Sequence, residues 1–310
     1  MKKLLRIVLT GVAALVALVL AGLLTTTIVN TAASASEASR IEDYGQRVTV
    51  DGKHMNVLVE GDGEQTIVLL PGFGTGSPAL DFSPLIAELS PMYRVVAVEP
   101  FGYGLSDQTD VPRTTSHIVD EVHEAVQGLG IDEYVLMGHS IAGIYALEYV
   151  ERFRDEVTAF VGIDSSVPGQ PGMDADLPVD AMRAAKALGI TRVVTAMAGD
   201  PYADLPYDQA TREQLGMISL RNTSSSTYSD EMSRIAANFR DARGKTFPAD
   251  LPVLLFVQAD NPTVEGWLPL HEEQAASVDR GEVVPLDADH YLHHTKSPEI
   301  AAAVERFLGR

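Results

Sequence analysis

The amino-acid sequence predicts an α/β fold: a doubly wound, mostly parallel sheet of eight strands, with a helical lid inserted after the sixth strand. Three observations support this. From Arg47 onward, apolar runs of strand length alternate with amphipathic helical segments. Such alternation implies right-handed crossovers and a parallel sheet covered on both faces. From about Val167 to Ala249 the strand signals fade and helical segments follow one another, after which the sheet pattern resumes.

The first four strands follow from short apolar segments between turns. RVTVDG and HMNVLVEGDG form an expected hairpin, punctuated by Asp51-Gly52 and by Gly61-Asp62-Gly63. TIVLLPG and YRVVAVEP are continuous apolar runs, as in a sheet covered on both faces. The stretch SPALDFSPLIAEL between them has helical spacing.

The remaining elements continue the alternation. SHIVDEVHEAVQGLG is an amphipathic helix with Ile118, Val122 and Val126 on one stripe and a glycine stop. A fifth strand YVLMGHS, a helix from Ile141 to about Phe153 and a sixth strand VTAFVGIDSS follow. The insert has helical segments DAMRAAKALG, ATREQLGMISL and DEMSRIAANFRDA. Strands VLLFVQ and EVVPLD and helices LHEEQAASV and PEIAAAVERFL complete the fold.

Charge and composition exclude several classes of function. The net charge is −20. Residues 1–40 are basic and the remainder is strongly acidic, so the chain lacks the Lys and Arg clusters that nucleic-acid binding requires. The absence of cysteine excludes disulfides, thiol catalysis and thiolate metal sites. We expect no nucleic-acid partner, no cofactor and no metal.

Residues 1–30 are predicted to be a transmembrane anchor or a signal segment. The uncharged stretch from Ile7 to Val29 covers roughly 34 Å as a helix, which exceeds a hydrocarbon core of about 30 Å. Lys2, Lys3 and Arg6 precede it and are expected to stay inside the cell. An uncleaved anchor gives a single-pass protein of the cell membrane with an extracytoplasmic body. Cleavage near the small residues Ala33 and Ala35 would instead give a secreted protein. Residues 31–44 are interpreted as a linker.

The stretch VLMGHSIAG contains the candidate nucleophile Ser140. A buried strand runs into this serine and a helix begins at once, which predicts a strained turn that projects the hydroxyl above the sheet. Such a turn needs small neighbours, and Gly138, Ala142 and Gly143 provide them. The alternative, a serine that only caps an ordinary helix, fits this context less well.

Two further segments are expected near Ser140. The loop LLPGFGTGSP follows the third strand, and the backbone N–H groups of Phe73 and Ile141 are the candidate donors of an oxyanion hole. His290 follows the eighth strand, where it could reach Ser140 as a base. Two other histidines, His293 and His294, lie one turn later. Their adjacency raises a metal site as an alternative, but no carboxylate spacing supports one.

The chain from Arg47 to Arg310 resembles the α/β-hydrolase superfamily in PGFGTG, GYGLSD, GHSIAG and DADHYLHHTKSPEI. It departs from many members in having Pro71 in place of histidine and Ala142 in place of glycine. The resemblance implies a nucleophilic serine, an orienting acid and a general-base histidine. It also implies that residues 45–310 form one α/β-hydrolase domain, with its helical lid at about 167–249.

The acid has two candidates. Many relatives carry it after the seventh strand, but the matching position here holds Asn261, and Asp260 is one residue early. A one-residue shift on a strand turns the side chain the opposite way. Another branch, which includes haloalkane dehalogenases, has the acid after the sixth strand, where this chain has Asp164. Asp164 is the preferred acid and Asp260 the alternative.

The resemblance therefore implies a serine hydrolase that cleaves an ester-like bond of a small, apolar substrate, in the manner of a carboxylesterase or lipase. Dehalogenase and epoxide hydrolase chemistry require a carboxylate where Ser140 stands. The alternatives are an amide, peptide or carbon–carbon bond hydrolase with the same triad, and a weakly catalytic, membrane-tethered ligand-binding protein. Trp267, Phe82 and Met217 are candidates to line an apolar pocket, or they simply pack in the core.

Overall fold

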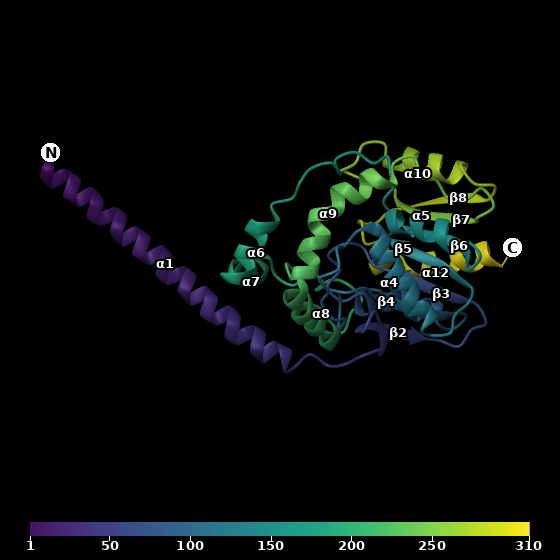
Figure 1. The fold of residues 1–310 in the computed structure, drawn as a ribbon, viewed down its shortest axis with the longest axis horizontal. Helices are drawn as coiled ribbons and strands as arrows, with labels where there is room; N and C mark the ends of the chain where they lie inside the picture. Colours follow the sequence, from purple (N-terminus) through teal and green to yellow (C-terminus); the bar gives the residue numbers. More distant parts are fainter. Residues whose placement is uncertain (310) are drawn as a thin grey trace.

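A computed structural model describes residues 1–309, so Arg310, the last residue of the predicted hydrolase domain, lies outside the described residues. Eight strands form one sheet in the order β1-β2-β4-β3-β5-β6-β7-β8. Strand β2 pairs antiparallel with β1 and β4, and the other neighbouring strands are parallel, which confirms the predicted doubly wound sheet (Figure 1). The strands are β1 (Gln46–Val50), β2 (Lys53–Glu60), β3 (Thr66–Leu70), β4 (Arg94–Glu99), β5 (Tyr134–His139), β6 (Val157–Ile163), β7 (Val253–Gln258) and β8 (Gly281–Leu286).

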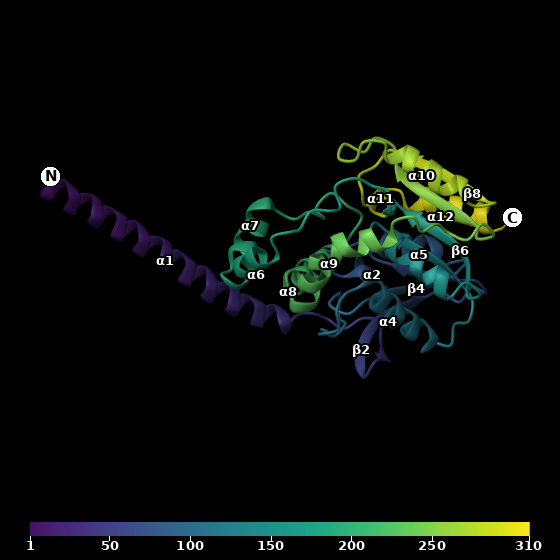
Figure 2. The ribbon, with the colours of Figure 1, turned by 45° about the horizontal axis from the view of Figure 1, so that its top comes forward.

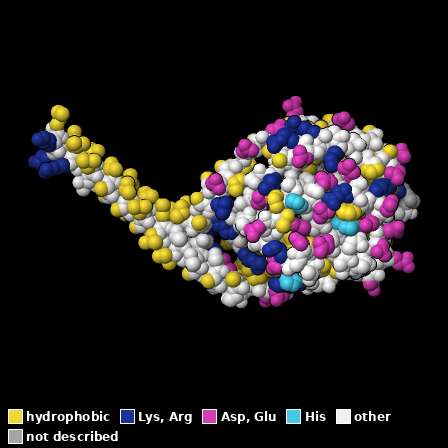
Figure 3. Space-filling model, viewed as in Figure 1, with side chains coloured by type: hydrophobic (Ala, Val, Ile, Leu, Met, Phe, Trp, Pro, Cys, Tyr) yellow, Lys and Arg dark blue, Asp and Glu magenta, His cyan; other side chains and the backbone are white. Residues whose placement is uncertain are grey.

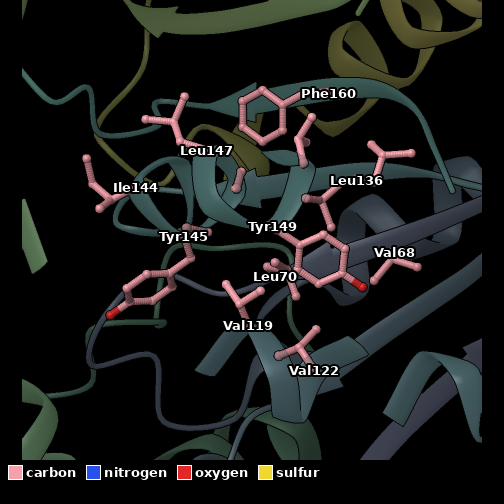
Figure 4. Close-up of a cluster of buried hydrophobic side chains, with 14 of the residues drawn as sticks. Val68, Leu70, Val119, Val122, Leu136, Ile144, Tyr145, Leu147, Tyr149 and Phe160 are labelled. Carbon is pink, nitrogen blue, oxygen red and sulfur yellow. The ribbon is translucent and has the colours of Figure 1, made fainter. Parts of the chain in front are cut away.

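Helices cover both faces of the sheet because successive residues of each strand point to opposite faces. In β3, Val68 and Leu70 join one buried cluster with α4 and α5, whereas Ile67 and Leu69 join a second cluster with α3 and α12. Figure 4 shows part of the first cluster, in which side chains of α4 and α5 pack against those of β3, β5 and β6. The helices packed around the sheet are α2 (Pro78–Asp81), α3 (Ser83–Leu89), α4 (Thr115–Gln127), α5 (Ala142–Arg152), α10 (Trp267–Ala276), α11 (Leu292–Thr295) and α12 (Ser297–Leu308).

Four helices lie between β6 and β7, within the segment predicted as a helical insert: α6 (Val179–Ala187), α7 (Ile190–Ala198), α8 (Gln209–Asn222) and α9 (Ser226–Ala242). Helices α8 and α9 bury side chains against the body, with Leu215 and Phe239 among them. Helices α6 and α7, all of whose residues are described, bury none. Figures 1 and 2 show α6 and α7 beside α1, set apart from the sheet.

A single long helix, α1 (Lys2–Ala38), precedes the body. It is long and apolar enough to cross a membrane, and among the described residues of this helix none is buried. The helix continues beyond Thr31, where the linker was expected to begin, and thus moves the start of the connecting segment to Ser39. Ala-rich sequence favours this extension, and Ser34 and Glu37 bind Arg192 of α7, which holds the last turns in helical form.

Candidate active site

Ser140 occupies a tight turn between β5 and α5. Its φ angle of 54° lies in the left-handed region, which a residue with a side chain adopts at a cost in strain. The residues around Ser140 must be small because larger side chains would clash with their neighbours. A Cβ on Gly138 would lie 2.9 Å from the Cβ of Ala142, and a Cβ on Gly143 would lie 2.4 Å from the Ser166 carbonyl oxygen. The three elbow residues chosen from the sequence therefore let the strand, turn and helix pack closely around the serine.

His290 connects Ser140 to Asp164 by two hydrogen bonds. It lies in the loop after β8, with Nε2 3.0 Å from Ser140 Oγ and Nδ1 2.6 Å from Asp164 Oδ2. Since an ionised carboxylate only accepts, the imidazole donates from Nδ1, and Nε2 is left to accept from the serine hydroxyl. The structure thus brings together the predicted nucleophile, base and preferred acid.

Asp164 follows β6 in a fully buried position with a φ angle of 43°. Its Oδ1 accepts hydrogen bonds from the Gln258 backbone N–H at 2.8 Å and from the Trp267 indole N–H at 2.7 Å. With His290 on the other oxygen, three donors face this carboxylate, which compensates for its removal from water. Hydrogen bonds to both oxygens thus hold the Asp164 side chain in one orientation.

The alternative acid, Asp260, follows β7 and lies outside the hydrogen-bonded chain of Ser140, His290 and Asp164. Asp260 is exposed. Asn261 accepts hydrogen bonds at its side-chain oxygen from the backbone N–H groups of Thr263 and Val264, at 2.9 and 2.8 Å. It therefore shapes the turn after β7, a role that Asn and Asp perform by local hydrogen bonding.

The two candidate oxyanion donors border the same cavity as the serine. Phe73 and Ile141 line a cavity of about 310 Å³ together with Ser140 and His290. Among the described residues, no carbonyl accepts a hydrogen bond from the backbone N–H of either residue. The loop before Phe73 lies against the elbow, because a Cβ on Gly72 would be 3.0 Å from the Ser140 Cβ. The backbone N–H groups of Phe73 and Ile141 therefore remain candidate donors to an oxygen in the cavity.

The rest of the cavity wall is mixed. Apolar side chains come from Met173, from Ile235 and Phe239 of α9, and from Val264 and Trp267. The polar remainder is Ser166, Gln170, Gln258, Asn261 and Thr263. Of the aromatic and methionine side chains expected to line a pocket, Trp267 does so. Phe82 instead packs in the core beside α3, and Met217 borders a different cavity, which is lined by α1, α7 and α8.

His139, next to the serine, supports the His290 loop from below. It is buried, and its Nε2 lies 3.2 Å from the backbone carbonyl oxygen of His290. Burial lowers the pKa of His139 well below its usual value, and the neighbouring His293 and His290 act in the same direction. A neutral His139 therefore donates its Nε2–H to the His290 carbonyl and helps to position the loop that carries His290.

The sequence interpretation missed a carboxylate beside the histidine pair. Nε2 of His293 lies 2.7 Å from Asp81 Oδ2, and Nε2 of His294 lies 2.9 Å from Asp81 Oδ1. All three residues are buried, and their ligand atoms lie within 4.8 Å of one another, close enough to hold a metal ion. The expectation of no metal rested on the lack of such a carboxylate, and this premise is wrong. The signal available in the sequence was an aspartate inside the apolar helical run SPALDF.

Asp81 is expected to stabilise the fold in a pH-dependent way. Burial alone would raise the pKa of Asp81, but hydrogen bonds from His293 and His294 outweigh it and hold the pKa well below its usual value. Because the folded state then prefers the ionised form, this stabilisation is present above about pH 4 and is lost as the pH falls further. Asp81→Asn should lower the free energy of unfolding by about 1–3 kcal/mol at pH 7, since a buried imidazole N–H loses its acceptor.

Urea unfolding between pH 3 and pH 7 measures this effect. The difference between the wild type and Asp81→Asn should shrink as the pH falls below about 4. The exposed Asp132→Asn serves as the control and should show little difference at any pH. A difference for Asp81→Asn that stays constant across this range would contradict the assignment.

Known proteins resemble this chain in sequence and in fold. A model of the alpha/beta hydrolase family matches residues 67–304. The chain is 25% identical over 277 residues to a 2-(acetamidomethylene)succinate hydrolase of Mesorhizobium japonicum, covering 85% of this chain and 94% of that protein. It is 33% identical over 135 residues to the uncharacterized protein YbdG of Bacillus subtilis, covering 43% of this chain and only 42% of that protein. The enol-lactonase of Burkholderia xenovorans has the same fold, with a TM-score of 0.65 at 19% identity over 86% of this chain and 100% of the lactonase.

Proposed function

Because the chain belongs to the alpha/beta hydrolase family, we propose that it is a serine hydrolase that cleaves an ester-like acyl bond. The observation that carries this proposal is the hydrogen-bonded chain Ser140–His290–Asp164 at the edge of a cavity. The hydrolase relative that aligns with most of the chain supports hydrolytic chemistry.

Acylation would begin when His290 takes the proton of Ser140. Nε2 of His290 accepts the hydroxyl proton at 3.0 Å while Oγ attacks the substrate carbonyl carbon. Asp164, 2.6 Å from Nδ1, holds the tautomer with a free Nε2 and stabilises the imidazolium that forms. His290 then returns the proton to the leaving alcohol, and the acyl group remains on Ser140. A water molecule, activated by the same histidine, releases the acid.

The developing negative charge would be held by the backbone N–H groups of Phe73 and Ile141. Both residues border the cavity beside Ser140, and the N-terminus of α5 points toward the same place. Such fixed donors stabilise the tetrahedral intermediate without reorganisation, which contributes several kcal/mol in known enzymes.

We propose that the helical insert acts as a lid. Met173, Ile235 and Phe239 of this segment supply apolar wall to the cavity, so they would contact the acyl or alcohol part of a substrate. At about 310 Å³ the cavity is near the small end of ligand sites. We therefore expect esters with short acyl chains to be preferred.

We also propose that α1 anchors the protein in the cell membrane as a single span. Lys2, Lys3 and Arg6 precede the apolar stretch, which favours an intracellular N-terminus and an extracytoplasmic body. The contacts that α7 makes with Ser34 and Glu37 join this helix to the body and favour its retention over cleavage.

Covalent labelling tests the proposed chemistry. A fluorophosphonate probe should label the folded protein once, and peptide mass spectrometry should locate the adduct on Ser140. In a panel of aryl esters, acetate and butyrate esters should turn over faster than a palmitate ester. If Ser140 stays unlabelled in protein that is demonstrably folded, the hydrolase proposal fails.

A further inference from the structure

Helices α6 and α7 form a hairpin with an unusual exposed face. Ile190, Val193, Val194 and Met197 recur at helical spacing i, i+3, i+4, i+7 along α7, which sets them on one stripe. Their side chains are 37%, 42%, 59% and 83% exposed. A stripe of this kind normally packs on a core, but here the body of the protein leaves it uncovered.

The tip of this hairpin packs on the apolar part of α1. The Thr26 hydroxyl donates to the Leu188 carbonyl oxygen at 2.7 Å. Gly189 forms the turn between α6 and α7 with a φ angle of 75°, and a Cβ there would lie 2.3 Å from the Thr26 carbonyl oxygen. Only glycine permits this close approach, so the tip is fixed against Thr26.

The opposite face of α7 is clamped to the end of α1. Arg192 donates to both carboxylate oxygens of Glu37, at 2.5 and 2.7 Å, and to the Asn30 side-chain oxygen at 3.0 Å. Since Arg192 lies on the far side of α7 from the apolar stripe, this clamp turns the stripe away from α1. Lys186 holds α6 by donating to the Arg221 carbonyl oxygen at 2.7 Å.

The position of these contacts along α1 sets the depth of the hairpin. Thr26 lies inside the uncharged stretch that ends at Val29, about 5 Å short of its end at the helical rise of about 1.5 Å per residue. Glu37 lies roughly 12 Å beyond that end. Figure 3 shows hydrophobic side chains running along α1 as far as the place where the helix meets the body. The hairpin tip is therefore level with the boundary of the apolar span.

We propose that the α6–α7 hairpin inserts its tip and apolar stripe into the outer interface of the phospholipid bilayer, beside the membrane span. This inference rests on the anchoring role proposed for α1. The bilayer is the occupant because the hairpin tip is level with the end of the apolar stretch of α1. Gly189 and Arg192 fix the stripe at that height. Apolar side chains at this boundary bind lipid by the same burial that holds interfacial helices.

For the enzyme, the consequence is that the helical insert, which forms one wall of the cavity at Ser140, is held at the membrane surface. Met173, which lines the catalytic cavity, lies in the segment that leads directly into α6. Helix α9, with Ile235 and Phe239 in the cavity wall, belongs to the same insert. Contact with the bilayer would hold the helical insert between α1 and the cavity.

The absence of cysteine makes a direct test available, because single cysteines can be labelled without background. The full chain, carrying Ile190→Cys, Val194→Cys or Met197→Cys with a bimane fluorophore, is reconstituted into phosphatidylcholine–phosphatidylglycerol vesicles. Lipids with brominated acyl chains then quench only labels that reach the bilayer. Leu15→Cys reports on the anchor itself, and Asp132→Cys on the exposed surface of the body.

We expect brominated lipid to reduce the bimane fluorescence at least about twofold at position 190, less at position 194 and least at position 197. The reason is that the hairpin tip lies deepest in the bilayer. Leu15→Cys should be quenched strongly and Asp132→Cys should not. Quenching at Leu15 without quenching at 190 or 194 overturns the hairpin inference and leaves the anchor standing. Loss of quenching at Leu15 overturns the anchor. Labels at 190 and 194 that escape both brominated lipid and aqueous iodide would show that a second protein copy covers the stripe, which also overturns the inference.

Discussion

Replacing Ser140 with alanine is expected to reduce ester turnover by a factor of about 10⁴ or more and to abolish fluorophosphonate labelling. Oγ of Ser140 is the atom of the hydrogen-bonded chain that can form the acyl bond, and among residues 1–309 no other hydroxyl is hydrogen-bonded to His290. The loss should appear in kcat, because the cavity walls that bind substrate stay in place. Turnover of short aryl esters measures it.

A matched control separates this loss from a general effect of serine removal. Ser233 is an exposed serine on α9, and Ser233→Ala should retain full turnover. Thermal unfolding of Ser140→Ala should show an intact fold, because alanine keeps the Cβ of serine and the backbone strain at the positive φ angle is unchanged. If purified Ser140→Ala keeps more than a tenth of the activity, Ser140 is not the nucleophile.

Asp164→Asn is expected to reduce kcat by a factor of about 10⁴. The reason lies in the two donors on Oδ1, the Gln258 N–H and the Trp267 indole N–H, which require an acceptor at that position. The asparagine oxygen must therefore take that place, and its amide NH₂ then faces Nδ1 of His290. The imidazole is forced into the tautomer that carries its proton on Nε2, and that nitrogen cannot accept the proton of Ser140.

Asp260→Asn is the matched control, because it makes the same chemical change at the neighbouring strand end. Asp260 is exposed, so this variant should retain turnover and its pH profile. A single result would reverse the assignment: loss of turnover in Asp260→Asn together with an active Asp164→Asn. Steady-state kinetics on one short ester suffices for both variants.

The local features of this protein could be predicted from sequence because each depends on nearby residues. Buried parallel strands are continuous apolar runs, so β3 to β7 are recognisable without knowledge of their neighbours. The turn at Ser140 needs small residues within three positions, and Gly138, Ala142 and Gly143 lie there. The predicted doubly wound sheet and its helical insert follow from the order of these elements.

Other features depend on residues that are distant in the chain. The extension of α1 to Ala38 is coupled to Arg192, more than 150 residues later. Asp81 meets His293 and His294 only because α2 and α11 pack on the same side of the sheet. No residue spacing within either segment indicates such a contact. The sequence can therefore identify candidate residues, but it does not show which of them are in contact.

The sequence by itself determined the fold, the strained serine turn and the presence of an apolar N-terminal span. Only the tertiary structure decided which aspartate faces His290. Strands β6 and β7 are neighbours, so their carboxyl ends bring Asp164 and the Asp260 segment to the same edge of the sheet. The choice between them depends on the φ angle of 43° at Asp164 and on the Trp267 indole, which arrives from α10. A backbone angle and a contact across more than one hundred residues cannot be read from local pattern, because both are consequences of the packed fold.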